Sequence, residues 1–230
     1  MGFRLRLSQA GDVIRSGDRL ELMRKPIYSE STGIGLLKEL PPDPDPRVTR
    51  ITRELRPATS ADLDYLVNDT GADPTDPQDR MDRRVQARIA SNLGTRCCYV
   101  ADSDDGHPGF VQYLFMSADN ELFQASYSHT GPPLKADEAM VEFLYVAPAA
   151  RTMSFVTECM NLVIEQARTQ GARSVQTWPD AGNRGALMAS HLVGFRPFGV
   201  RRSRYRFFHK STTYQPRVVP MSEVLHGAGG

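Results

Sequence analysis

The chain has 230 residues, of which 40% are hydrophobic and 24% are charged, and its formal net charge is +1. This length suits one large domain or a domain with an extension, and the composition is that of an ordinary globular protein. A charge so close to zero creates no field that would favour nucleic acid or an acidic membrane surface. No apolar run approaches the roughly 20 residues of a membrane span, so neither nucleic acid nor a membrane is expected as a partner.

Three cysteines, Cys97, Cys98 and Cys159, make an odd and sparse set. Such a set indicates reduced thiols rather than a disulfide framework, and it predicts a cytoplasmic location. No group of cysteines and histidines has the spacing of a metal site, so no metal is expected.

Residues 1–47 are predicted to form an N-terminal extension that ends in a linker. Within it, "FRLRL" and "DRLELM" alternate apolar and polar residues, as half-exposed strands do. The prolines of "PPDPDPR", residues 41–47, allow neither a helix nor a strand ladder and mark the linker. The extension has little apolar surface of its own, so we expect it to pack on the main domain or on another subunit.

From Val48 onward the pattern alternates between strands and helices, which predicts an α/β domain over residues 48–210. The expected strands are 50–56, 95–102, 109–116, 139–146, 173–178 and 202–208. The expected helices are 57–69, 80–94, 152–170 and 183–193. On the second of these helices, Met81, Val85 and Ile89 form one apolar face. Residues 117–138 are predicted to be a long connection, and the polar residues 211–230 a C-terminal tail.

Four features follow one another in the second half of this domain. They are the strand end Glu142-x-Leu144-x-Val146-x-Pro148, the helix start at Arg151, the later helix start Asn183-x-x-Ala186, and the helix end Gly194-Phe195. This ordered set, after a strand, two helices and a hairpin, resembles the GNAT N-acetyltransferase superfamily over about Val48 to Lys210. The resemblance implies a central mixed sheet flanked by helices, here with an N-terminal extension.

The resemblance also implies acetyl-CoA or another acyl-CoA as co-substrate. In such folds the strand of Glu142 and the strand of Trp178 splay apart after Val146, which leaves a slot for the pantetheine arm. Backbone N–H groups near Tyr145 and Val146 would polarise the thioester carbonyl. The pyrophosphate would lie on the helix that begins near Thr152, where unpaired N–H groups and the helix dipole favour anions.

The phosphate-binding loop of this family reads Arg/Gln-x-x-Gly-x-Gly/Ala, and here those places hold Arg151, Ser154 and Val156, with Phe155 between the last two. The Ser154 hydroxyl can donate to a phosphate oxygen. Val156 either narrows the pyrophosphate path or points inward to the core. We interpret the loop as a reshaped cofactor site; the alternative is a helix start that only packs.

Glu142 stands where several enzymes of the family keep a general base that acts through water; the alternative is a glutamate that faces solvent. The usual general acid, a tyrosine seven residues after Asn183, is replaced by Ser190. Ser190 could hydrogen-bond the leaving thiolate, or His191 could take the role of the acid. Asn183 matches the family pattern, and its alternative role is that of a helix N-cap.

Just before the linker, "STGIGLLKEL" also resembles a helix that starts with Gly-x-Gly. Too little chain precedes it to build the sheet that such a phosphate-binding loop would follow. Ser31 or Thr32 is therefore expected to cap a helix without a phosphate role.

These residues predict an acyl-CoA-dependent N-acyltransferase that moves an acetyl or other acyl group to an amine on a small molecule or a protein. Acceptor specificity is expected in residues 69–80 and 117–139. The alternative is a catalytically inactive GNAT-fold protein with a structural or binding role in an assembly, which the missing glycines and tyrosine favour. A homo-oligomer or an assembly through the N-terminal extension stays open.

Overall fold

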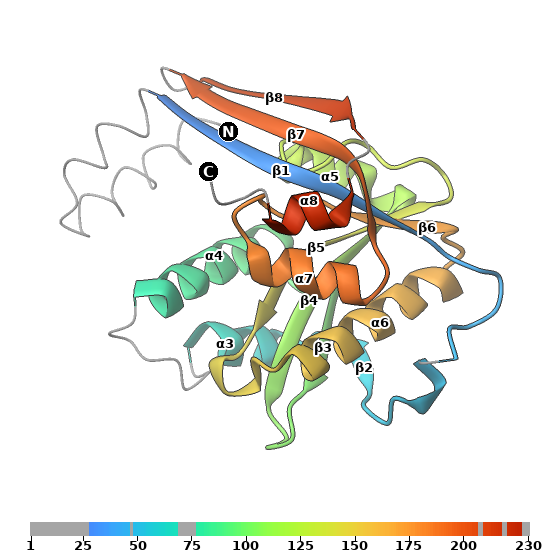
Figure 1. The fold of residues 1–230 in the computed structure, drawn as a ribbon. Helices are drawn as coiled ribbons and strands as arrows, with labels where there is room; N and C mark the ends of the chain where they lie inside the picture. The colour runs from blue at the N-terminus through green and yellow to red at the C-terminus, as the bar shows by residue number, and fades with distance from the viewer. Residues whose placement is uncertain (1–27, 47, 69–76, 207–208, 218–219, 227–230) are drawn as a thin grey trace.

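Figure 1 shows the fold in the computed structural model, which describes residues 28–46, 48–68, 77–206, 209–217 and 220–226. The two strands expected before residue 28 lie outside the described residues. No helix of the described ranges is long and apolar enough to cross a membrane.

The described strands are β1 (Tyr28–Glu39), β2 (Leu55–Pro57), β3 (Cys98–Asp102), β4 (Pro108–Met116), β5 (Glu138–Val146), β6 (Ser174–Thr177), β7 (Arg196–Arg206) and β8 (His209–Pro216). The described α-helices are α3 (Ser60–Asn68), α4 (Pro77–Leu93), α5 (Asn120–Tyr127), α6 (Met153–Thr169), α7 (Arg184–Leu192) and α8 (Met221–His226). Short 3-10 turns occupy η1 (Val48–Arg50), η2 (Ser117–Asp119) and η3 (Pro148–Ala150).

The strands form one mixed sheet in the order β2-β3-β4-β5-β6-β1-β7-β8. Only β5 and β6 pair in parallel among these strands; the other neighbours are antiparallel. One hydrophobic core joins the sheet to α6, α7 and α8, and the other joins it to α3, α4 and α5 (Figure 1). This confirms the predicted α/β fold, a central mixed sheet flanked by helices.

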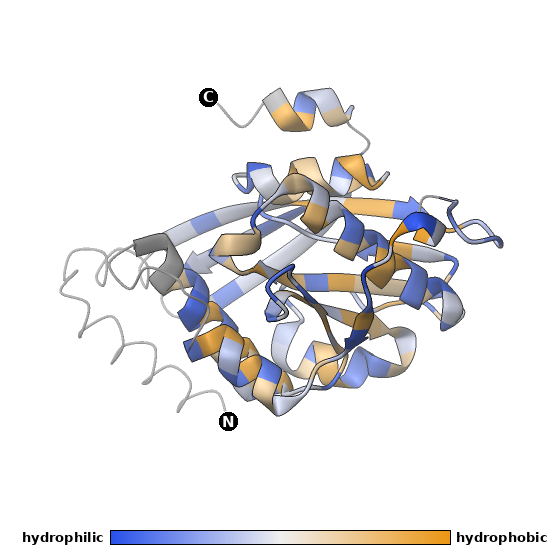
Figure 2. Cartoon of the chain, turned by 90° about the horizontal axis from the view of Figure 1, so that it is seen from below, coloured by the Kyte–Doolittle hydropathy of each residue, from blue (hydrophilic) through white to orange (hydrophobic). Residues whose placement is uncertain are grey.

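The helices are amphipathic, and in Figure 2 each of the longer ones carries both hydrophobic and hydrophilic residues. On α6 the side chains of Cys159, Val163 and Ala167 recur every four residues and are fully buried. On α4 the prediction was only partly right. Ile89 is buried, whereas Met81 and Val85 are 53% and 46% exposed, because the first half of the helix does not pack on the core.

Strand β1 corrects the prediction that Ser31 or Thr32 caps a helix. Residues 28–39 instead pair with β6 on one side and with β7 on the other. Ile34 and Leu36 alternate with glycines and face the core, which is the period-two pattern of a strand. Strand β8 likewise extends the sheet beyond Ser211. The edges of the sheet therefore do not coincide with the boundaries that the sequence suggested at residues 47 and 210.

The two glycines of β1 leave room for large side chains. A Cβ on Gly33 would lie 2.7 Å from Nε of Arg201, and a Cβ on Gly35 would lie 2.7 Å from the ring of Trp178. Real Cβ atoms do not approach other atoms so closely, so a side chain at either position would force Arg201 or Trp178 to shift. The Gly-x-Gly that resembled a phosphate loop thus serves close packing across the sheet.

Helix α5 occupies part of the region predicted to be a long connection. Phe123 and Tyr127 lie one helical turn apart and are buried in the core beneath the sheet. The side chain of Asn120 accepts a hydrogen bond from the backbone N–H of Leu134 and donates one to its carbonyl, each 2.8 Å long. A helix of eight residues has too few apolar positions to show a clear period in the sequence.

A bulge in β5 bends this strand away from β6. Val111 of β4 pairs with Tyr145, but Tyr113 pairs with Glu142, so two residues of β5 face one residue of β4. Phe143, inside the bulge, has a φ of 58°. The parallel pairing of β5 with β6 ends at Met140 and Gln176. The strands therefore diverge, and they do so before Glu142 rather than after Val146.

Gly35→Ala should destabilise the fold, because its Cβ would displace the buried Trp178 ring. Overpacking of this kind costs about 1–3 kcal/mol of unfolding free energy, measurable by urea denaturation. Gly182→Ala is the control, since a Cβ there meets nothing within 4 Å. Equal unfolding free energies for the two variants would show that the ring accommodates the methyl group.

Candidate active site

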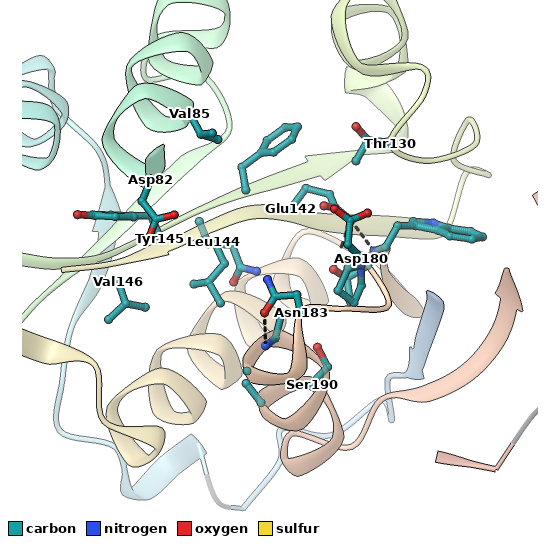
Figure 3. A pocket seen from close by; sticks show the side chains of 18 of the residues that line it. Asp82, Val85, Thr130, Glu142, Leu144, Tyr145, Val146, Asp180, Asn183 and Ser190 are labelled. Carbon is teal, nitrogen blue, oxygen red and sulfur yellow. Dashed lines mark hydrogen bonds between the residues drawn. The ribbon is translucent and has the colours of Figure 1, made fainter. Parts of the chain in front are cut away.

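A cavity of about 750 Å³ opens where β5 and β6 diverge (Figure 3). In this view Val146 and Asp82 lie toward one end, and Thr130 and Asp180 toward the other. The cavity brings together eight of the ten predicted site residues: Glu142, Tyr145, Val146, Arg151, Thr152, Val156, Asn183 and Ser190. Ser154 and Phe155 line a separate hollow of about 460 Å³ on the other side of the start of α6.

Glu142 spans the gap between the diverging strands. Its Oε1 accepts a hydrogen bond from the backbone N–H of Trp178 at 2.5 Å and another from the hydroxyl of Thr177 at 3.3 Å. The residue is 8% exposed, so the alternative of a glutamate that faces solvent is wrong. Burial raises the pKa of Glu142 to about 7, against the opposing effects of the Trp178 N–H and Arg201. A carboxyl group with such a pKa can accept a proton near neutral pH.

The N-terminus of α6 forms one wall of the cavity. Thr152 caps this helix, and its Oγ1 accepts a hydrogen bond from the backbone N–H of Phe155 at 3.4 Å. Arg151, just before the cap, donates from Nε to the carbonyl of Val146 at 3.1 Å and from Nη2 to the Asp82 carboxylate at 3.3 Å. The guanidinium is thereby held between the end of β5 and α4. The wall combines a helix N-terminus with a cation, a combination that favours anions.

The side chain of Val156 contacts both of the places considered from the sequence, the core and the cavity. Its side chain is half-buried against the core around α6 and also lines the cavity. It therefore occupies space that a glycine would leave open. Ser154 is exposed and borders the smaller hollow, where its hydroxyl lies 3.5 Å from that of Thr152.

Helix α7 forms the floor of the cavity. Asn183 is its N-cap: its Oδ1 accepts a hydrogen bond from the backbone N–H of Ala186 at 3.0 Å, and the residue also lines the cavity (Figure 3). Ser190, about two helical turns further along α7, is buried and lines the cavity as well. His191 is exposed and does not line it. The expectation that His191 could act as the general acid is therefore wrong.

Several residues that line the end of the cavity near Thr130 and Asp180 (Figure 3) were not singled out from the sequence. They are His129 and Thr130 after α5, Asp180 after β6, Arg201 on β7 and Lys210 on β8. Only His129 and Thr130 fall within a loop expected to govern acceptor specificity. Arg201 and Lys210 come from strands whose neighbours are set by the sheet order, for which the local sequence carries no signal, and Asp180 follows β6.

Glu142→Gln should make the unfolding free energy less dependent on pH. The pKa of Glu142 is about 7 in the folded chain and ordinarily 4.5, so folding favours its protonated form. The stability that this group contributes is therefore complete below pH 4.5 and is lost as the pH rises through 7. Relative to the variant, the wild type should lose on the order of 3 kcal/mol across that window. Urea unfolding at about pH 5 and about pH 8.5 measures the difference, and parallel curves would contradict the raised pKa.

Comparisons with solved structures show where this architecture recurs. A GCN5-related glucosamine N-acetyltransferase region of a fungal multi-domain GH3 β-N-acetylglucosaminidase superposes with a TM-score of 0.53 at 12% identity, covering 85% of this chain and 22% of that one. A GCN5-related N-acetyltransferase from Sphaerobacter thermophilus gives a TM-score of 0.46 at 14% identity, with 83% and 57% covered. The present chain thus spans about a fifth of the fungal protein, and its likeness to that protein is one of fold.

No curated protein matches the chain significantly. The sequence profile of the acetyltransferase (GNAT) family, in contrast, matches residues 63–195. This range runs from α3 to the end of α7 and includes the divergence of β5 from β6, Glu142 and the start of α6. The chain belongs to the GNAT acetyltransferase family.

Proposed function

We propose that this chain is an acyl-CoA-dependent N-acyltransferase, which moves an acetyl or other acyl group to an amine. The observation that carries the proposal is Glu142, a buried carboxyl group with a pKa of about 7 that faces the cavity in the gap between β5 and β6. A general base works best when its pKa lies near the working pH. A glutamate kept only for packing would gain nothing from such costly burial.

The residues around the cavity fit an acyl-CoA. The first N–H groups of α6 have no partner within the helix, and together with Arg151 they suit the negative charge of a pyrophosphate. Beyond Met140 the edge of β5 that faces β6 no longer takes part in strand pairing, so a pantetheine arm can lie along it. When bound, the CoA thioester supplies the activated acyl group.

Each of these residues has a role in such a transfer. Glu142 takes the proton of the attacking amine, directly or through a water molecule. The backbone N–H groups near Tyr145 and Val146 donate to the thioester carbonyl oxygen and stabilise the negative charge that develops on it. Ser190, buried on the floor of the cavity, donates its hydroxyl to the thiolate that leaves.

Glu142→Gln should lower kcat by roughly 100-fold while it leaves the Kd for acetyl-CoA nearly unchanged, because it removes a proton acceptor but keeps the side-chain shape. The release of free CoA thiol and isothermal titration measure the two quantities. Glu138→Gln is the matched control, since Glu138 lies on the same strand, pairs with Lys135 and does not line the cavity.

Two outcomes would count against this scheme. An unchanged kcat in Glu142→Gln would remove Glu142 from the mechanism. Failure of the wild type to bind acetyl-CoA or a longer acyl-CoA at millimolar concentration would favour the inactive GNAT-fold protein.

Val156→Ala should tighten acetyl-CoA binding a few-fold, because the valine side chain occupies part of the cavity beside the start of α6. Alanine also keeps a good helix former at this position, so the loss of helix propensity that glycine would bring is avoided. Val163→Ala is the control: it lies on the same helix, fully buried. It should lower the melting temperature without changing the Kd. If Val156→Ala also only destabilises, the valine is core packing and the pyrophosphate path does not pass it.

A further inference from the structure

The end of the cavity farthest from α6 is lined by cationic side chains. Arg201 on β7 and Lys210 on β8 lie there beside His129 and Thr130. These residues come from segments distant in the chain, and the sheet order brings them together next to the gap that holds Glu142. No part of the proposed acyl-CoA site needs them.

Arg201 is built into this wall. It pairs with Gly33 across the sheet, and its guanidinium lies over that glycine, where any Cβ would collide with it. The residue is 7% exposed. Nη1 donates to the carbonyl of Thr130 at 2.8 Å, and Nη2 donates to the carboxylate of Asp180 at 2.7 Å. Each of these nitrogens carries a second N–H group.

The charge of Arg201 is only partly balanced. Its one carboxylate partner among the described residues, Asp180, has a side chain that is 65% exposed and therefore well solvated. Nε of Arg201 is buried and has no hydrogen-bond partner among the described residues. A buried guanidinium without full compensation favours a further anion nearby.

Lys210 adds a second positive charge on the same side of the sheet. It pairs with Tyr205, so the alternation of β7 and β8 places it on the face that also carries Ser203 and Arg201. No ion pair joins Lys210 to a carboxylate in the described part of the chain. Partial burial lowers the pKa of its ammonium group, and Arg201 contributes to the same effect.

The pKa of His129 reflects the positive charge at this end of the cavity. Burial, together with the positive charges of Lys210, Arg201 and Arg88, lowers the pKa of its imidazole to about 4. The imidazole is therefore neutral at pH 7 and can only donate or accept hydrogen bonds. Three cations act on one point of the cavity wall, which makes this end favourable for an anion.

We propose that the amine acceptor is a small molecule that also carries an anionic group, a carboxylate or a phosphate. Arg201 and Lys210 bind this group, and Glu142 receives the amine at the other side of the same space. The arrangement matches an acceptor with opposite charges at its two ends, since the ammonium form is attracted to the carboxylate and the anion to the cations. The inference rests on the proposed acyl transfer, whose acceptor class it names.

The test compares matched acceptors that differ only in the anionic group. Free amino acids are paired with their carboxamides, and phosphoethanolamine is paired with ethanolamine, so the two arms separate a carboxylate from a phosphate. Acetylation by the full chain is followed through release of CoA thiol. Binding is followed through the melting temperature of the CoA-saturated protein, which does not depend on turnover.

Lys210→Gln is the informative variant, with Lys135→Gln as the control. Lys135 is exposed, pairs with Glu138 and does not line the cavity. In the wild type, an anionic acceptor should have a kcat/KM at least roughly tenfold above that of its neutral partner, the equivalent of about 1.4 kcal/mol. Lys210→Gln should reduce this ratio several-fold through KM, and Lys135→Gln should keep it.

The outcomes separate this inference from the proposed function. If acetyl-CoA does not bind, the proposed function itself fails. If acetyl-CoA binds but neutral partners react or stabilise as well as anionic ones, only the inference is overturned. It is also overturned if no anionic acceptor reacts or raises the melting temperature, or if Lys210→Gln keeps the wild-type ratio.

Discussion

The hydrogen bond from the backbone N–H of Trp178 to Glu142 holds together the part of the sheet on which the cavity depends. At this point β5 and β6 have stopped pairing, and a side chain replaces the missing backbone contact. Because the carboxyl group fills the gap, it is buried, and because it is buried, its pKa rises to about 7. The divergence of β5 from β6 thus creates both the cavity and a group able to take a proton.

The opposite side of this gap depends on glycines. The ring of Trp178 is buried next to Gly35 of β1 and Gly199 of β7, and the guanidinium of Arg201 crosses Gly33. Larger residues at these places would displace both side chains, which line the cavity. Strand β1 therefore takes part in shaping the site, although only Ser31 from this strand lines the cavity.

The two ends of the cavity differ in how they favour negative charge. At the start of α6 the favourable groups are backbone N–H groups and Arg151, which is held in place by Asp82 and the carbonyl of Val146. At the far end they are the side chains of Arg201 and Lys210. Glu142 lies between the two ends. This order suits the proposed acyl transfer, in which the acyl donor and the acceptor would enter from different sides and meet at Glu142.

The sequence by itself determined the alternation of strands and helices, the strand of Glu142, the helix starts near Thr152 and Asn183, and the family, because these features depend on short-range periodicity and on neighbouring residues. It misassigned residues 31–40 as the start of a helix and missed α5 and the cationic end of the cavity. The tertiary structure alone decided that β1 lies between β6 and β7, that the strands diverge before Glu142, and that Arg201 and Lys210 face the same space. Pairing between distant segments sets all three, and burial, which raises the pKa of Glu142, exists only after those segments have met.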